Sequence, residues 1–331
     1  MVHLKKRALG QHRLTVGFTI VELLIVIVVI GILAAITIVA FNGISGRAKV
    51  ASVQSDLNSS LKTLETFRLT TSTNEQYPVD LAASNLKASN GTTYEYSVDN
   101  AAKPATFCLT ATNNGTAYYI GPGAKPKEGT CYEDFGLVGW WQLNGNPNDS
   151  SGNGINGSVS GPTLTTGSNN VANTAYNFAG GSDAITIPAN SVLNNQNFTY
   201  TAWVKPSSLN AATTVVTGAP TGSPQLRLDS GKITLLSAGV RQFPSSSATV
   251  AANVWSYIGV TYNLTGTYTY YINGVAVGSG TDYRAMTFTS SLIGRNAAAT
   301  EPFVGAIDGV RMYNRVLSAA EMLSLYTSVP Q

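Results

Sequence analysis

Histidine is almost absent from this chain of 331 residues, which contains only His3 and His12. The sequence after residue 12 therefore cannot supply a Ser-His-Asp triad, histidine acid–base catalysis or a histidine-rich zinc site. Cysteine is equally rare, with only Cys108 and Cys131. An exported chain meets oxidising conditions, so a disulfide between these two is expected, and it would remove the only cysteine nucleophiles. Free thiols are the alternative.

Charge is also scarce, since charged residues make up 11% of the chain and the formal net charge is +3. The first 17 residues hold Lys5, Lys6, Arg7 and Arg13 and no acid. Without this +4 leader, the side chains sum to −1 (3 − 4). This balance gives no reason to expect a surface that binds nucleic acid.

One long apolar run extends from Phe18 to Phe41, and Glu22 is its only charged residue. A helix needs roughly 20 residues to cross a bilayer core of ~30 Å, so this run is long enough. The basic leader is expected to stay in the cytoplasm, which places everything after residue 41 outside. Secretory cleavage near Ala34-Ala35 is the alternative.

Gly17, Phe18, Thr19 and Glu22 follow one another at a spacing that resembles the N-terminus of a type IV prepilin or pilin-like protein. The resemblance implies that a prepilin peptidase cleaves between Gly17 and Phe18 and that Phe18 is then N-methylated. It also implies that Glu22 pairs with a neighbouring pilin subunit and sets the register of a filament. A plain membrane anchor with an accidental acid is the alternative. The chain is thus expected to be a single-pass membrane protein that later joins an extracellular pilus.

The helix is expected to continue beyond the apolar run. Between residues 47 and 69, apolar side chains recur at spacings of three and four and form one stripe: Val50, Val53, Leu57, Leu61, Leu64 and Phe67. Gly31, Gly43 and Gly46 are predicted weak points, each costing up to ~1 kcal/mol relative to alanine. A continuous helix that packs closely at each glycine is the alternative.

A small globular part follows, with strands predicted over residues 92–99, 106–112 and 117–121. Residues 122–130 (PGAKPKEGT) are predicted to be a linker. The domain organisation predicted from these features is a leader (1–17), a membrane-spanning and extended pilin helix (18–70), a small pilin globular domain with its linker (71–135) and a second domain (136–331). The pilin part is therefore expected to be an α+β domain with a long helix and a small antiparallel sheet.

The second domain contains short aromatic and β-branched segments separated by Gly, Asn, Ser and Pro, a pattern that predicts an all-β sandwich. Several segments occur in an order that resembles the concanavalin A-like lectin/glucanase superfamily in its laminin-G-like form: GWWQLNGNPNDSSGNGINGS, YNFAGGSDAITIP, FTYTAWVKP, WSYIGVTYN, YYINGV and FVGAIDGVRMYNRVLSAAEM. The resemblance implies a jelly-roll sandwich. Ser318 and Glu321 form a capping-box pattern that predicts a closing helix.

Some enzymes of this superfamily carry their acids at alternating positions of one strand, and this sequence has no such pair. Members of the superfamily often hold a calcium ion, for which Asp149, Asp183 and Asp308 are the candidate ligands by position. Turn capping and strand-end hydrogen bonds are the alternative roles for these acids. Trp203 and Trp255 are predicted core residues. Trp140 and Trp141 are adjacent, so in a strand one would face inward and the other outward.

The sequence therefore predicts a minor type IV pilin that displays a lectin-like adhesin domain and has no enzymatic activity. Its expected partners are other pilin subunits, prepilin peptidase, the membrane and a carbohydrate or surface protein. Two alternatives stay open: a pseudopilin of a secretion or DNA-uptake system with a contact module, and a membrane-tethered glycan hydrolase.

Overall fold

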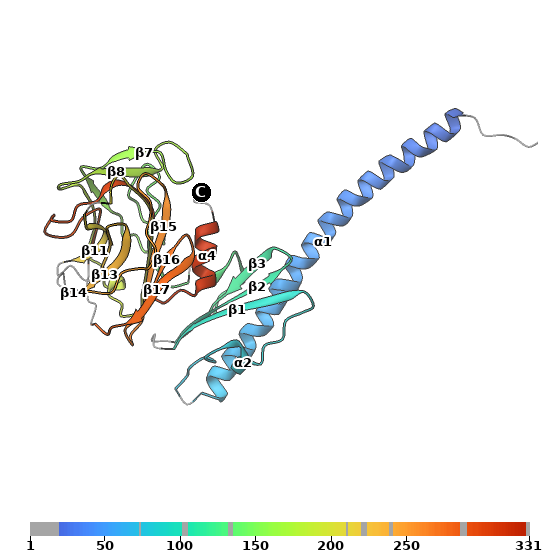
Figure 1. Ribbon diagram of the computed structural model, residues 1–331. Coiled ribbons are helices and arrows are strands. Elements are labelled where there is room, and N and C mark those ends of the chain that lie inside the picture. The colour runs from blue at the N-terminus through green and yellow to red at the C-terminus, as the bar shows by residue number, and fades with distance from the viewer. Residues whose placement is uncertain are drawn as a thin grey trace, which may run out of the picture.

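The computed structural model describes residues 20–72, 74–100, 105–131, 135–209, 211–219, 224–237, 241–284 and 290–328. Its first element is the 51-residue helix α1 (Ile20–Thr70), which projects far beyond the rest of the molecule at its N-terminal end (Figure 1). The helix runs through Gly31, Gly43 and Gly46 without a break, and no atom lies within 4 Å of a Cβ built at any of them. The glycines therefore do not mark close packing against another described element.

The C-terminal half of α1 packs against a small antiparallel sheet of order β1-β2-β3-β4 (Figure 1). The strands are β1 (Thr92–Asp99), β2 (Thr106–Asn113), β3 (Thr116–Ile120) and β4 (Lys127–Glu128), and a short helix α2 (Leu81–Ser84) precedes them. Val53, Leu57 and Leu64 from the predicted stripe are fully buried in this core with Phe107. The stripe from α1 therefore holds the sheet, and the predicted strands are confirmed to within a residue or two.

One expectation for this region was incomplete. Residues 122–130 were predicted to be a linker, but β4 lies within them and pairs with β3, with Tyr118 opposite Glu128. The polar composition of this stretch suits an edge strand, where one side of the ladder faces water. The chain thus stays attached to the sheet almost as far as Cys131.

The second domain is a sandwich of two antiparallel sheets. The eight-stranded sheet has the order β17-β16-β15-β10-β19-β8-β7, and β5 pairs with β19 off this path. Its strands are β5 (Leu137–Trp141), β7 (Thr163–Thr165), β8 (Ala175–Ala179), β10 (Phe198–Pro206), β15 (Ser256–Tyr262), β16 (Thr267–Ile272), β17 (Val275–Thr281) and β19 (Val304–Tyr313).

The seven-stranded sheet has the order β14-β13-β12-β11-β18-β9-β6. Its strands are β6 (Ser158–Ser160), β9 (Ala184–Ile187), β11 (Thr213–Ala219), β12 (Gln225–Asp229), β13 (Lys232–Ser237), β14 (Arg241–Gln242) and β18 (Ser290–Ile293). A 3-10 turn, η1 (Ser191–Leu193), lies between β9 and β10. Alternate side chains from both sheets fill the core between them, including fully buried Trp141 and Phe178 from the eight-stranded sheet and Leu226 from the seven-stranded sheet.

A closing helix, α4 (Ala319–Thr327), covers part of the outer face of the eight-stranded sheet (Figure 1). The predicted capping box is present, because Ser318 accepts from the Glu321 backbone and Glu321 accepts from the Ser318 backbone. Met322 and Leu325 of α4 are buried against Tyr257 and Tyr313 of the sheet. α4 therefore covers an apolar part of the outer face of this sheet.

Glu321 also links the two domains. Its carboxylate lies 2.7 Å from the Arg315 guanidinium, and the Ser97 hydroxyl from β1 approaches it at 3.5 Å. Arg315 in turn donates to the Phe135 carbonyl at 2.7 Å. The start and the end of the sandwich therefore meet beside the N-terminal sheet, where α4 lies between the two domains in Figure 1.

Among the described residues, no helix combines the length and the hydropathy required to cross a membrane.

Candidate functional site

The residues predicted to direct processing and assembly lie at the start of the chain. Gly17 and Phe18 lie outside the described residues. Glu22 lies in the first turn of α1, but its side chain is not among those that the structure describes. Their predicted roles therefore stay predictions. From Ile20 to Ile36, the apolar side chains of α1 are exposed, by 83% and 60% at the two ends.

Cys108 and Cys131 form a disulfide, with their Cα atoms 5.7 Å apart. Cys108 lies on β2, and the Cys131 backbone N–H donates to the Thr110 hydroxyl of the same strand at 2.9 Å. The bond therefore fixes the chain to the N-terminal sheet immediately before it enters the sandwich.

Asp149, the first predicted calcium ligand, binds the loop that contains it. Its carboxylate accepts from the backbone N–H groups of Trp140, Ser151 and Ile155 at 2.9–3.0 Å and from the Ser151 hydroxyl at 2.9 Å. Burial acts to raise the pKa of Asp149, but these hydrogen bonds outweigh it and lower the pKa below its usual value. The carboxylate is thus held ionised as the acceptor that shapes this loop.

The other two predicted calcium ligands also have local partners. Asp183 accepts from the Ala179 backbone N–H at 2.8 Å, and Asp308 accepts from the backbone N–H and the hydroxyl of Ser168. Burial raises the pKa of Asp308 in spite of these hydrogen bonds. Within the described ranges, no three carboxylate, histidine or cysteine side chains gather as a metal site would require. The calcium site stays a prediction.

The outer face of the eight-stranded sheet presents both polar and aromatic side chains. Along β10, Phe198, Tyr200, Ala202 and Val204 point into the core, so Thr199, Thr201, Trp203 and Lys205 point outward. The prediction that Trp203 lies in the sandwich core is therefore wrong. Its side chain is half-buried and packs against Tyr257 and Tyr326 near α4. Trp255 is half-buried just before β15.

An aromatic hollow lies on this face beside α4. Trp140, Trp203 and Arg311 line it, together with Leu325 of α4, and the Arg311 guanidinium stacks 4.4 Å from the centre of the Trp140 ring. Trp141 is fully buried in the core, which confirms that the two adjacent tryptophans face opposite ways. The hollow has a volume of only about 20 Å³. It has room for about one water molecule, so it cannot hold a sugar ring as it stands.

A polar hollow of about 360 Å³ lies farther along the same face. Lys205 on β10, Ala306 on β19 and Asn177 on β8 are register partners in adjacent strands, so they form one row across the sheet. Because the Ala306 side chain is shorter than the side chains on either side of it, it forms the floor of the hollow. Ser207 and Asn253 form part of the wall. This volume is within the ~300–1,000 Å³ typical of ligand sites.

The side chains that line the polar hollow have few partners of their own. Asn177, Lys205, Ser207 and Asn253 make no side-chain hydrogen bond or ion pair to any residue that the structure describes. Asn253 is held in place through its backbone, which has φ +60° and donates to the Pro206 carbonyl at 2.7 Å. The hollow therefore presents amide, hydroxyl and ammonium groups that are available to a ligand.

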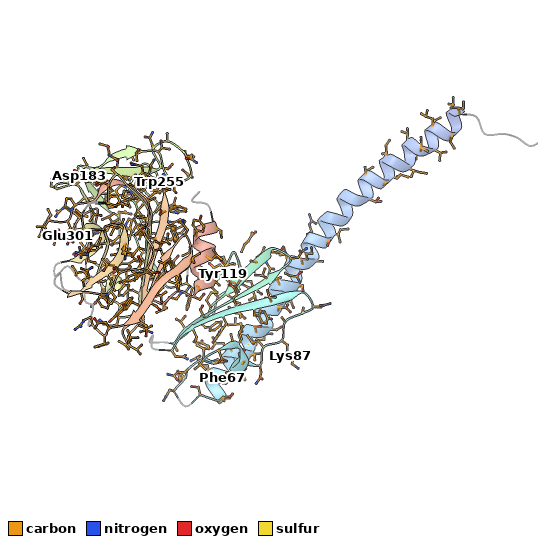
Figure 2. All side chains as sticks on the ribbon, viewed as in Figure 1. Phe67, Lys87, Tyr119, Asp183, Trp255 and Glu301 are labelled. Carbon is orange, nitrogen blue, oxygen red and sulfur yellow. A yellow bond between two sulfur atoms is a disulfide. The ribbon has the colours of Figure 1, made fainter. Side chains whose placement is uncertain are left out.

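The outer face of the seven-stranded sheet is polar in a different way. Arg227 on β12 is 7% exposed and pairs with Glu301 and, at 3.7 Å, with Asp229. Gln225 also donates to Glu301, and Gln242 accepts from Arg227 at 2.8 Å. We call these five residues the arginine network. In Figure 2, Glu301 lies on the side of the sandwich turned away from α1.

Both carboxylates of the arginine network lie within ion-pair distance of the same guanidinium. Sequence reasoning missed this network because its members come from β12, β14 and the loop before β19. It also missed the polar hollow, although the alternation of FTYTAWVKP already placed Lys205 on an outer face.

Residues 178–322 match the family described as the concanavalin A-like lectin/glucanases superfamily, in a laminin-G form. No curated protein sequence matches the chain. The matched segment includes Lys205, Asn253 and Ala306 of the polar hollow, together with the arginine network.

Two solved structures illustrate the similarity. Domain 4 of AbnA, an extracellular arabinanase from Geobacillus stearothermophilus in complex with arabinotriose, is 25% identical with a TM-score of 0.49, and the match covers 58% of this chain and 98% of that one. The binding domain of Paraclostridial Mosquitocidal Protein 1 is 20% identical with a TM-score of 0.51, covering 60% and 53% respectively. The similarity to the mosquitocidal protein domain shows that the two domains share a fold. Residues 178–322 of the sandwich therefore match a concanavalin A-like lectin/glucanase domain of the laminin-G-like type.

Proposed function

We propose that the sandwich is a non-enzymatic carbohydrate-binding domain and that its ligand occupies the polar hollow. The observation that carries this proposal is an open hollow of about 360 Å³ whose amide, hydroxyl and ammonium groups have no partner within the described chain. Saccharides offer hydroxyl groups that match such donors and acceptors. The superfamily match supports this ligand class, since lectins and glucanases both act on carbohydrates.

Binding without hydrolysis is favoured by the state of the acids. Glycoside hydrolysis needs two carboxyl groups on either side of the scissile bond, one of them able to donate a proton. Asp149 is bound by its loop, Asp308 is buried against Ser168, and Glu301 is paired with Arg227. A membrane-tethered hydrolase is therefore the weaker alternative. Release of reducing sugar from a polysaccharide panel by the purified protein would favour it.

The binding proposal is tested by filling the hollow. Ala306 forms its floor, so Ala306→Leu should lower glycan binding by at least tenfold while the core stays intact. Ala276→Leu is the matched control, because Ala276 is an exposed residue of β17 in the same sheet. Both variants of the full-length protein would be applied in detergent to a glycan array. Equal binding by the two variants would place the ligand elsewhere.

We also propose that the N-terminal part acts as a pilin-like anchor that presents the sandwich outside the cell. Support comes from the Gly17, Phe18 and Glu22 pattern, from the 51-residue α1 and from the exposed apolar side chains in its first half. In a filament, the first halves of such helices would pack together and remove these side chains from water. A pseudopilin of a secretion or DNA-uptake system would share these features.

Two measurements test the anchor. Mass spectrometry of the native protein should find an N-methylated Phe18 at the start of a chain of 314 residues (331 − 17). A start near Ala35 would support secretory cleavage. Glu22→Ala should insert into the membrane normally but enter sheared filaments less, whereas Thr37→Ala on the same helix should enter at wild-type levels.

A further inference from the structure

Among the described residues that line the polar hollow, Lys205 is the single charged one. Its side chain is half-buried, and no carboxylate of the described chain lies within ion-pair distance of it. Other partly buried cations of the sandwich do have partners: Arg295 donates to the Asn296 and Ala297 carbonyls, Arg311 stacks on the Trp140 ring, and two further arginines pair with acids. Arg227 pairs with Glu301, and Arg315 pairs with Glu321. The positive charge in the hollow therefore lacks the compensation that its counterparts receive.

The acid closest in register does not supply this compensation. Asp308 lies two residues beyond Ala306 on β19, the residue directly opposite Lys205, and therefore faces the same side of the sheet. Its carboxylate is 1% exposed and accepts two hydrogen bonds from Ser168, in the loop between β7 and β8. The Lys205 ammonium is thus left to solvent or to a ligand.

We propose that the ligand is a saccharide that carries an anionic group, either a carboxylate or a sulfate, and that this group binds Lys205. The proposal rests on the carbohydrate-binding function above and names the ligand class for the same hollow. Asn177, on the far side of Ala306, and Ser207, beside Lys205, are placed to bind the hydroxyl groups of the same sugar.

The physical reason is the cost of covering an ammonium group. A neutral ligand in the hollow would displace water from Lys205 and return only neutral hydrogen bonds. An anionic group returns a charge-assisted hydrogen bond, which is roughly twice as strong. The hollow therefore discriminates against neutral sugars more than it would with an uncharged residue at position 205.

The test uses a glycan array in which each uronic acid, sialylated or sulfated glycan stands beside its methyl ester, asialo or desulfated counterpart. The full-length protein in detergent should bind at least one acidic member about tenfold more tightly than its neutral partner. This preference should weaken at high salt. Lys205→Gln should abolish the preference, Lys205→Arg should keep it, and Lys232→Gln, at an exposed site on the seven-stranded sheet, should change nothing.

The outcomes separate the two proposals. Binding to neutral and acidic members alike would overturn the role of Lys205 and leave carbohydrate binding intact. A preference for acidic glycans that survives in Lys205→Gln would also overturn it. Failure to bind any glycan would overturn both proposals.

Discussion

The two outer faces of the sandwich both carry polar side chains, but they use them differently. On the seven-stranded sheet, Arg227, Glu301 and Gln225 bind one another and are largely buried. On the eight-stranded sheet, the side chains of Lys205 and Asn177 line an open hollow and make no hydrogen bond or ion pair to a described residue. A satisfied polar cluster contributes to the stability of the fold, whereas groups without partners contribute to recognition. Substitutions on the two faces should therefore separate stability from binding.

The largest loss of stability is expected from Arg227→Ala. Removing the guanidinium, whose side chain is 9% exposed, leaves Glu301 without its closest cation, which should lower the free energy of unfolding by about 3 kcal/mol. Denaturant unfolding followed by tryptophan fluorescence measures this. Arg284→Ala is the control, because Arg284 and Asp282 are about one-quarter exposed and should lose at most about 1 kcal/mol. Similar losses in both variants would mean that the arginine network has no special role.

A smaller loss is expected from Asp149→Ala, which removes the acceptor of three backbone N–H groups and one hydroxyl. The expected cost is about 2 kcal/mol, because the freed donors can partly turn to water. Asp183→Ala is the comparison, since Asp183 accepts from a single backbone N–H and should cost less. An equal loss in both variants would show that the loop does not depend on Asp149.

The same variants test pH dependence and calcium. The pKa of Asp149 is lowered in the folded protein, so its contribution to stability is present above the unfolded pKa of about 3.9 and is lost as pH falls through the folded value. The difference in the free energy of unfolding between wild type and Asp149→Ala should therefore shrink in acid.

If calcium binds Asp149, Asp183 and Asp308, adding it should raise the melting temperature of the wild type, and the Ala variant of each aspartate should lose that rise.

Much of the fold could be predicted from local sequence patterns. The stripe from Val53 to Leu64 marked the buried side of α1, and the turn at Asn273-Gly274 separates β16 from β17. Such features depend on residues close together in the chain. The polar hollow does not, because Lys205, Ala306 and Asn177 meet only through the pairing of three strands. The position of α4 over Trp203 likewise depends on packing between distant segments. The local pattern therefore predicts Trp203 in the core of the sandwich, whereas it packs beneath α4 on the outer face.

A still smaller effect is expected from Ser318→Ala, which removes the N-cap of α4 and should cost about 1 kcal/mol. Because α4 covers Trp203 and borders the aromatic hollow, its loosening should be visible as a shift in tryptophan emission. Ser324→Ala is the matched control within the same helix, since its hydroxyl makes no hydrogen bond to a described residue. Equal shifts in both variants would contradict a specific effect of the cap.

The smallest effect on stability is expected from the hollow itself. Lys205→Met and Asn177→Ala remove side chains that bind nothing in the described chain, so each should change the free energy of unfolding by no more than about 0.5 kcal/mol. Thermal and denaturant unfolding of both variants, beside Arg227→Ala, measure this. A loss above about 1 kcal/mol would reveal a structural partner for these groups and would remove the basis for assigning them to a ligand. An unchanged stability joined to lost glycan binding would separate the two faces fully, because the groups that recognise the ligand would then be those that the fold does not need.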